Sequence, residues 1–150
     1  MIVYLDRDAL VRLYVKERGR DTVRRAVAEA TAVATTAIGY PWVREWLGKA
    51  VRDGMVSRAG ASVILTRLDL DWHHLVRVPA ADPVLRLAGD LADRWSLDGR
   101  SGMELASALV LRQYGEGCQV GFAAFERRLA RAAAEEGLEV LTARLLKGAS

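Results

Sequence analysis

Short apolar segments alternate with longer segments of helical periodicity along the chain. The segment at 2–5 is apolar and partly β-branched, and Asp6 ends it, a pattern typical of a buried parallel strand. From Ala9 the apolar residues recur at helical spacing until Gly19 interrupts them. Because the two patterns keep alternating towards the C-terminus, we predict an α/β fold with a central parallel sheet.

The predicted elements follow from where each pattern starts and stops. Strands are predicted at residues 2–5, 32–36, 74–78, 118–122 and 138–141. The helices predicted between them begin near Ala9 and continue with 21–30, 40–53, 57–70, 82–95, 101–113 and 126–136. Asp21 and Ser57 are the expected N-caps of two of these helices. Residues 1–150 are expected to form one domain, with a frayed tail at 146–150.

Composition narrows the class of protein further. The 150 residues are 51% hydrophobic and 27% charged, which supplies a core and excludes a disordered chain. The single cysteine, Cys118, excludes an internal disulfide framework, and we expect it to be buried at the start of a strand. No apolar stretch is long enough to cross a bilayer, and the N-terminus lacks a signal peptide's basic segment. We therefore expect a cytoplasmic protein with no membrane partner.

Basic residues exceed acidic ones by a small margin. The chain has 22 Lys and Arg against 19 Asp and Glu, a net charge of +3, which permits nucleic-acid binding without requiring it. Most of the basic residues are arginine, which binds phosphates in a bidentate manner, although a coding bias towards Ala and Arg would give the same composition. Candidate RNA contacts are Arg12, Arg127 and Arg128, and the alternative is that they form a solvated face.

Several acidic side chains follow or flank the predicted strands. In an open parallel sheet, ligands bind at the carboxyl ends of the strands, so acids from distant segments can meet at one rim. Carboxylates held close together repel each other, and a divalent cation such as Mg²⁺ relieves that repulsion and activates water for phosphodiester hydrolysis. Five acids are candidates for this rim: Asp6, Asp8, Glu45, Glu104 and Glu126.

The same acids also have purely structural interpretations. Asp8 is placed to cap the helix that begins near Ala9, and Glu126 is placed to interact with the dipole of its helix. Glu45 and Glu104 are compatible with solvated helix faces. Asp6 differs from them, because a carboxylate directly after a buried strand is poorly placed for stability and well placed for function.

Five segments, taken together and in order, resemble PIN domains and especially VapC-type toxins. The first runs from Met1-Ile-Val-Tyr-Leu-Asp to Tyr14, and the others cover residues 35–44, 105–109, 125–133 and 137–141. The resemblance implies a three-layer α/β/α sandwich. It also implies an endoribonuclease that acts on single-stranded or structured RNA with Mg²⁺ or Mn²⁺. Such proteins are often homodimers silenced by an antitoxin, so the resemblance implies both partners here.

The acidic positions of these domains are only partly kept in this chain. Asp6 matches the first acid, and Glu126 takes the fourth position with a longer side chain. Trp42 occupies the second position and Ser101 the third. Asp8 stands where a hydroxyl residue is usual. Trp42 would either fill the place of metal and water, stack on an RNA base or pack against the core.

Two further acids suggest a displaced site. Glu45 and Glu104 each lie three residues after a substituted position, and residues at this spacing share a helix face. In the displaced site, Asp6, Asp8 and Glu126 hold the metal, Glu104 supports it or orients water, and Glu45 is a further candidate.

The alternative is that the acidic site has eroded. The chain would then be a catalytically degenerate PIN-like module that acts by dimerisation or by binding an antitoxin-like partner. Apolar residues of the first two helices would form its groove: Leu10, Leu13, Tyr14 and Val27.

Overall fold

Parallel strands form the central sheet of this computed structural model. Within the described residues, 1–115 and 117–147, one five-stranded sheet has the order β3-β2-β1-β4-β5. Its strands are β1 (Ile2–Leu5), β2 (Ala32–Thr36), β3 (Val76–Val78), β4 (Val120–Ala123) and β5 (Glu139–Val140). The central strand β1 pairs with β2 and β4, with Leu5 opposite Ala123. The continuous apolar segment at 2–5 fits this central position, since both faces of β1 are covered.

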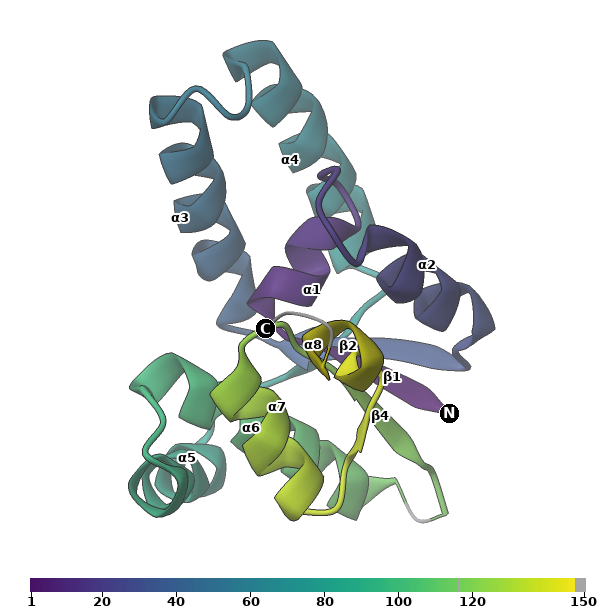
Figure 1. The fold of residues 1–150 in the computed structure, drawn as a ribbon, viewed down its shortest axis with the longest axis vertical. Helices are drawn as coiled ribbons and strands as arrows, with labels where there is room; N and C mark the ends of the chain where they lie inside the picture. Colours follow the sequence, from purple (N-terminus) through teal and green to yellow (C-terminus); the bar gives the residue numbers. More distant parts are fainter. Residues whose placement is uncertain (116, 148–150) are drawn as a thin grey trace.

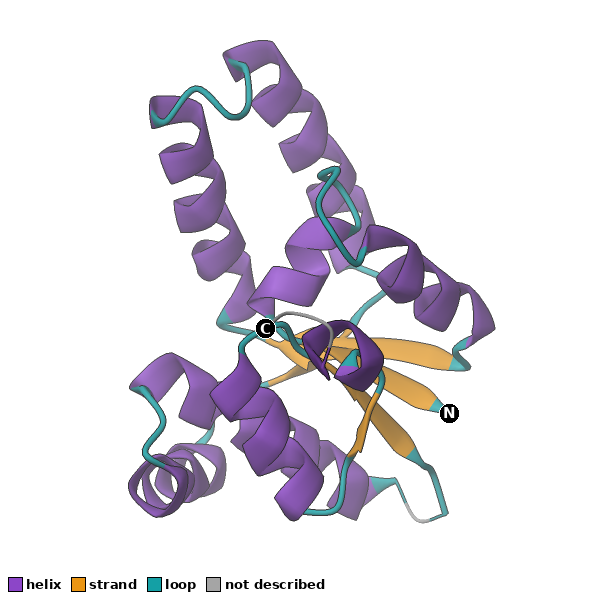
Figure 2. Ribbon diagram, viewed as in Figure 1, coloured by secondary structure: helices purple, strands orange, loops and turns teal. Residues whose placement is uncertain are grey.

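Helices cover both faces of the sheet (Figures 1 and 2), so the predicted three-layer α/β/α sandwich is confirmed. On one side lie α1 (Arg7–Arg12), α2 (Arg20–Glu29), α3 (Gly39–Arg52) and α4 (Arg58–Trp72). On the other lie α5 (Asp82–Trp95), α6 (Gly99–Tyr114) and α7 (Arg127–Glu135). The short α8 (Ala143–Lys147) follows β5. Figure 1 shows α3 and α4 extending away from the sheet as a long hairpin.

Successive residues of β1 face opposite layers, and this places the site described below. Val3 and Leu5 pack in the core of α1 to α4, whereas Tyr4 packs in the core of α5 to α7, as the two-residue period of a strand requires. The Tyr4 ring stacks on Phe122 of β4, with centroids 5.5 Å apart. The Tyr4 hydroxyl therefore points towards α6.

The close packing of α5 on α6 depends on Gly102. A Cβ at Gly102 would lie 2.7 Å from the backbone oxygen of Ala88, whereas one at Gly89 of α5 meets nothing within 4 Å. We expect Gly102→Ala to lower the free energy of unfolding by about 1–3 kcal/mol through overpacking. The control Gly89→Ala should raise it by about 0.5–1 kcal/mol through helix propensity. Urea unfolding at constant m-value measures both, and an equal effect of the two variants would contradict this explanation.

Some element ends differ from the prediction. Residue 19 is the N-cap of α2 in place of Asp21, because Gly19 adopts a left-handed conformation with φ of 91° that ends the preceding loop. The strand predicted from 74 begins at Val76, since α4 continues to Trp72. Ser57 caps α4 as predicted. Cys118 is exposed and lies before β4, so the prediction of a buried cysteine is wrong.

The C-terminal segment contains a short helix that the sequence did not predict. Helix α8 reaches Lys147, two residues into the tail predicted to be frayed, and residues 148–150 lie outside the described part. The Thr142 hydroxyl hydrogen-bonds to the backbone of Ala124, and Arg18 donates to the backbone oxygen of Leu145 at 2.8 Å. These contacts hold α8 against the sheet and the α1–α2 loop. Across the described part of the chain, every helix is too short or too polar to cross a bilayer.

Candidate active site

Asp6 lies at the carboxyl end of the central strand and is fully buried. Its backbone N–H donates to the Ala123 oxygen at 3.1 Å, which continues the pairing of β1 with β4. Its Oδ1 accepts a hydrogen bond of 2.7 Å from the Ala9 N–H and caps α1. This is the capping role that the structural interpretation gave to Asp8. Oδ2 has no hydrogen-bond partner among the described residues, although it is buried.

Glu104 of α6 is also fully buried and lies against the peptide bond that follows Asp6. Its Oε1 accepts from the Arg7 N–H at 2.9 Å, and its Oε2 accepts from the Tyr4 hydroxyl at 2.6 Å. The structure thus brings Glu104 and Asp6 together, and the interpretation of Glu104 as a solvated helix charge is wrong. We call Asp6 and Glu104 the acid pair.

Burial and mutual repulsion make the acid pair difficult to ionise. Desolvation raises the pKa of Asp6 well above its usual value, and the charges of Glu104 and Asp8 raise it further. Desolvation also raises the pKa of Glu104 to about 7, although the hydrogen bonds from Tyr4 and Arg7 act in the opposite direction. Full ionisation of both acids therefore requires a positive charge nearby.

The other predicted acids are engaged elsewhere. Asp8 pairs with Arg7, whose Nε and a terminal nitrogen each lie 3.0 Å from Asp8 Oδ1. Glu126 is the N-cap of α7, and its two oxygens accept from the N–H groups of Arg128 and Leu129 at 3.0 and 2.9 Å. Glu45 is exposed and lines a cleft of about 350 Å³ whose wall also includes Arg7 and Trp46.

The residues at the two substituted family positions, Trp42 and Ser101, are both packed within the protein. Trp42 is partly buried and packs against the core of α5 to α7. Ser101 is buried in the first turn of α6, and its N–H donates to Asp98 Oδ1 at 2.7 Å. Of the three interpretations of Trp42, packing against the core is the one that its contacts support.

Two charged residues at the start of α6 were missed by the sequence analysis. Asp98 is the N-cap of α6, and the N–H of Ser101 holds its pKa below the usual value. Arg100 follows two residues later, and its Nη1 is buried with no hydrogen-bond partner in the part of the chain that the structure describes. The Asp-Gly pair at 98–99, directly before an apolar helical segment, is the sequence signal for this N-cap.

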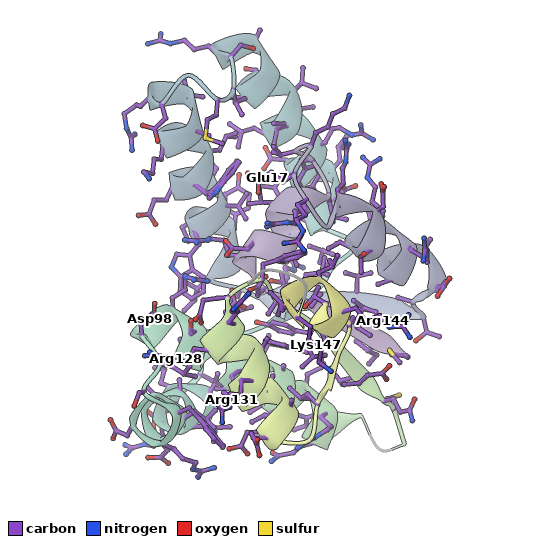
Figure 3. All side chains as sticks on the ribbon, viewed as in Figure 1. Glu17, Asp98, Arg128, Arg131, Arg144 and Lys147 are labelled. Atoms are coloured by element: carbon purple, nitrogen blue, oxygen red, sulfur yellow. The ribbon has the colours of Figure 1, made fainter. Side chains whose placement is uncertain are left out.

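The candidate RNA-binding arginines fall into two groups. Arg12 is engaged within the chain. Its guanidinium lies 3.7 Å above the Phe125 ring, pairs with Glu17 and donates to the backbone oxygens of Asp8 and Arg18. Arg127 and Arg128 are exposed at the start of α7. Arg128 donates to the Ser96 oxygen at 2.9 Å, and Figure 3 shows it on the same side as Asp98.

The acidic side chains at this edge of the sheet offer few ligands for Mg²⁺. Within residues 1–115 and 117–147, no group of three or more His, Cys, Asp or Glu side chains is placed to hold a metal ion. Mg²⁺ is, however, often held by one or two carboxylates together with waters and substrate phosphates. A buried carboxylate oxygen without a partner, beside a second buried acid, fits such a site. The residues present are thus compatible with a cation held partly by its substrate.

The five-stranded parallel sheet in the order β3-β2-β1-β4-β5, with helices on both faces, matches a PIN-like fold. The structure is similar to a chain in the crystal structure of FitAcB from Neisseria gonorrhoeae, with a TM-score of 0.63 and 16% sequence identity. The match covers 93% of this chain and 96% of that chain. No protein-family model matches the sequence, and neither does any curated protein. At this identity the similarity establishes the fold.

Proposed function

We propose that the protein is a PIN-like toxin with metal-dependent endoribonuclease activity. The observation that supports this proposal most is the free, buried Oδ2 of Asp6 beside Glu104. Such an arrangement is costly for folding and therefore favours a functional role. The resemblance of the sequence to VapC-type toxins and the likeness to FitAcB support the same class.

In this proposal Asp6 is the principal ligand of Mg²⁺ or Mn²⁺, and Glu104 stands beside it as second acid. Asp8 and Glu126 were also predicted as ligands, and both already accept contacts within the chain, Asp8 from Arg7 and Glu126 from the N–H groups that it caps. A divalent cation bound there would activate water and stabilise the leaving oxygen of a phosphodiester. The Tyr4 hydroxyl and the Arg7 N–H orient the Glu104 carboxylate.

The proposal is tested with the purified protein, a pool of single-stranded and structured RNAs, and Mg²⁺, Mn²⁺ or EDTA. We expect cleavage in either metal and none in EDTA. Calorimetric titration with Mn²⁺ should detect one binding site. Cleavage that persists in EDTA, or a protein that binds no Mn²⁺, would overturn the proposal.

A second candidate function is the binding of an antitoxin-like partner. A groove of about 330 Å³ lies between the end of α1, α2 and the end of α4, and its lining includes Leu13, Tyr14, Val27 and Leu75. Leu10, which was predicted to line it, is fully buried in the core. An apolar groove of this kind fits the apolar face of a short helix. The groove is compatible with either an active or an eroded acid pair.

The groove is tested by Val27→Asp, made in the protein co-expressed with candidate antitoxin-like proteins. A charge in the groove must be desolvated on binding, so we expect at least about tenfold weaker binding, equivalent to about 1.4 kcal/mol. Val63→Asp is the control, because Val63 is 61% exposed on α4. Copurification and size-exclusion chromatography report the complex and the predicted homodimer. Equal binding by both variants would rule out this groove.

A further inference from the structure

Two buried side-chain atoms, one from an acidic and one from a basic residue, have no hydrogen-bond partner in the part of the chain that is described. Among the described residues, Asp6 Oδ2 and Arg100 Nη1 are both buried and make no hydrogen bond. Arg100 lies in the first turn of α6, and Glu104 follows it at the i+4 position, which places the two on one helix face. Glu104 in turn contacts the Arg7 N–H directly after Asp6. Arg100 therefore shares a face of α6 with Glu104, and this face is turned towards the segment that contains Asp6.

The charge of Arg100 acts on the acids without touching them. Its guanidinium lowers the pKa of both Asp6 and Glu104, so it lies within electrostatic range of the acid pair. Within the described part of the chain, however, Arg100 forms no ion pair with either acid. A residue that served only to neutralise the acids would be expected to contact one of them, because a buried charge without a hydrogen bond is costly.

The unmet requirements of the two atoms are complementary. Arg100 Nη1 is a donor that needs an acceptor, whereas Asp6 Oδ2 is an acceptor that needs a cation or a donor. A phosphodiester accompanied by a divalent cation meets both needs, because its oxygens accept from guanidinium groups and also bind hard cations. The negative charges of the acid pair alone would repel such a phosphate. The positive charge of Arg100 beside them reduces this repulsion.

We infer that Arg100 is a phosphate-binding residue, which holds the RNA backbone against the acid pair. This inference rests on the proposed function, since it assigns the substrate contact of the same site. Arginine suits this position better than lysine, because its planar fork can donate to two phosphate oxygens while keeping its charge when buried. Asp98, at the start of the same helix, lies within electrostatic range of Arg100 and limits the positive charge that faces solvent.

The experiment measures RNA binding separately from cleavage. Fluorescence anisotropy of a labelled single-stranded RNA is recorded in Ca²⁺, for wild type, Arg100→Gln, Arg100→Lys and Arg58→Gln. Arg58 is exposed at the start of α4, on the distal hairpin, so Arg58→Gln makes the same charge change away from the site. We expect Arg100→Gln to bind at least about tenfold more weakly, as for loss of a hydrogen bond to a charged group. Arg100→Lys should recover part of the affinity.

A second measurement distinguishes substrate binding from a structural role. Calorimetric titration with Mn²⁺ alone should give Arg100→Gln an affinity equal to or higher than that of wild type, because a positive charge near the cation has been removed. The inference is overturned if Arg100→Gln binds RNA as well as Arg58→Gln does, or if its loss of RNA binding is matched by a loss of Mn²⁺ binding. Wild-type protein that binds RNA through Arg100 but cleaves none would refute the proposed activity and leave this inference supported.

Discussion

The free energy of unfolding is expected to fall by about 3 kcal/mol as the pH rises from about 4.5 to about 7, through the ionisation of Glu104 alone. Glu104 has a usual pKa of 4.5 and a pKa of about 7 in the folded protein. Between these values the folded chain binds the proton more tightly than the unfolded chain does. Stability is therefore greatest below the unfolded pKa, decreases through this interval and stays low above it. Asp6 acts in the same direction, because its pKa is also raised.

Urea unfolding of the metal-free protein at a series of pH values measures this effect. Glu104→Gln keeps an acceptor for the Arg7 N–H and removes the buried charge, so its profile should be flatter and its stability above pH 7 greater than that of wild type. Glu45→Gln is the matched control, because Glu45 is exposed, and it should leave the profile unchanged. Two results would show that the buried, ionisable Glu104 does not cause the pH dependence of the free energy of unfolding. One is a wild-type stability that increases over the same interval. The other is a Glu104→Gln variant whose stability falls with pH as steeply as that of wild type.

Much of the fold could be predicted because each element has a local cause. The strands at 2–5 and 32–36 and the helix from Asp82 to Trp95 occur with the predicted bounds. The first strand ends at the charge of Asp6, the second is rich in β-branched Val and Thr, and Pro83 fixes the first turn of the helix. The helix α8 was missed because five residues give almost no periodicity. Its position depends on contacts with Arg18 and Ala124, which are far away in the sequence.

The candidate site was predicted less completely, and the reason is its dependence on distant contacts. Asp6 could be singled out because the end of a buried strand is a local feature of the sequence, and its side chain is fully buried in the structure. The environment of Glu104 depends on Tyr4, which lies 100 residues earlier, and no local pattern records that contact. Asp8 and Glu126 were nominated by their places after strands, yet Asp8 pairs with the adjacent Arg7 and Glu126 caps α7, both through local contacts. Asp6 and Glu104 differ from them in being fully buried, and that burial depends on tertiary packing.

The buried acid pair also links stability to activity. A protein selected for stability alone would replace a buried, partnerless carboxylate oxygen, since an uncompensated buried charge is among the most costly features of a core. The chain instead places Arg100 near the acids without neutralising them by contact. Residues that bind ligands are commonly kept at a cost in stability. Substitutions in the acid pair should accordingly change stability and activity in opposite directions.

Asp6→Asn is expected to show this opposition most strongly. Asparagine keeps an oxygen that can cap α1, since Asn and Asp are equivalent N-caps, and it removes the negative charge buried beside Glu104. We therefore expect a higher urea midpoint than that of wild type at pH 8. Under the proposed function, RNA cleavage in Mg²⁺ should fall by about 100-fold or more, the size of effect seen when one preorganised electrostatic contact is removed.

Asp90→Asn is the control for this prediction, because Asp90 is exposed on α5 and the same chemical change there should alter neither property. Both measurements use the same protein preparation, and cleavage is compared in Mg²⁺ and in EDTA. A variant that gained stability and still cleaved RNA as wild type does would remove Asp6 from the reaction. A variant that lost both stability and cleavage would instead show that the Asp6 charge supports the fold, because the gain expected from removing a buried charge would be absent.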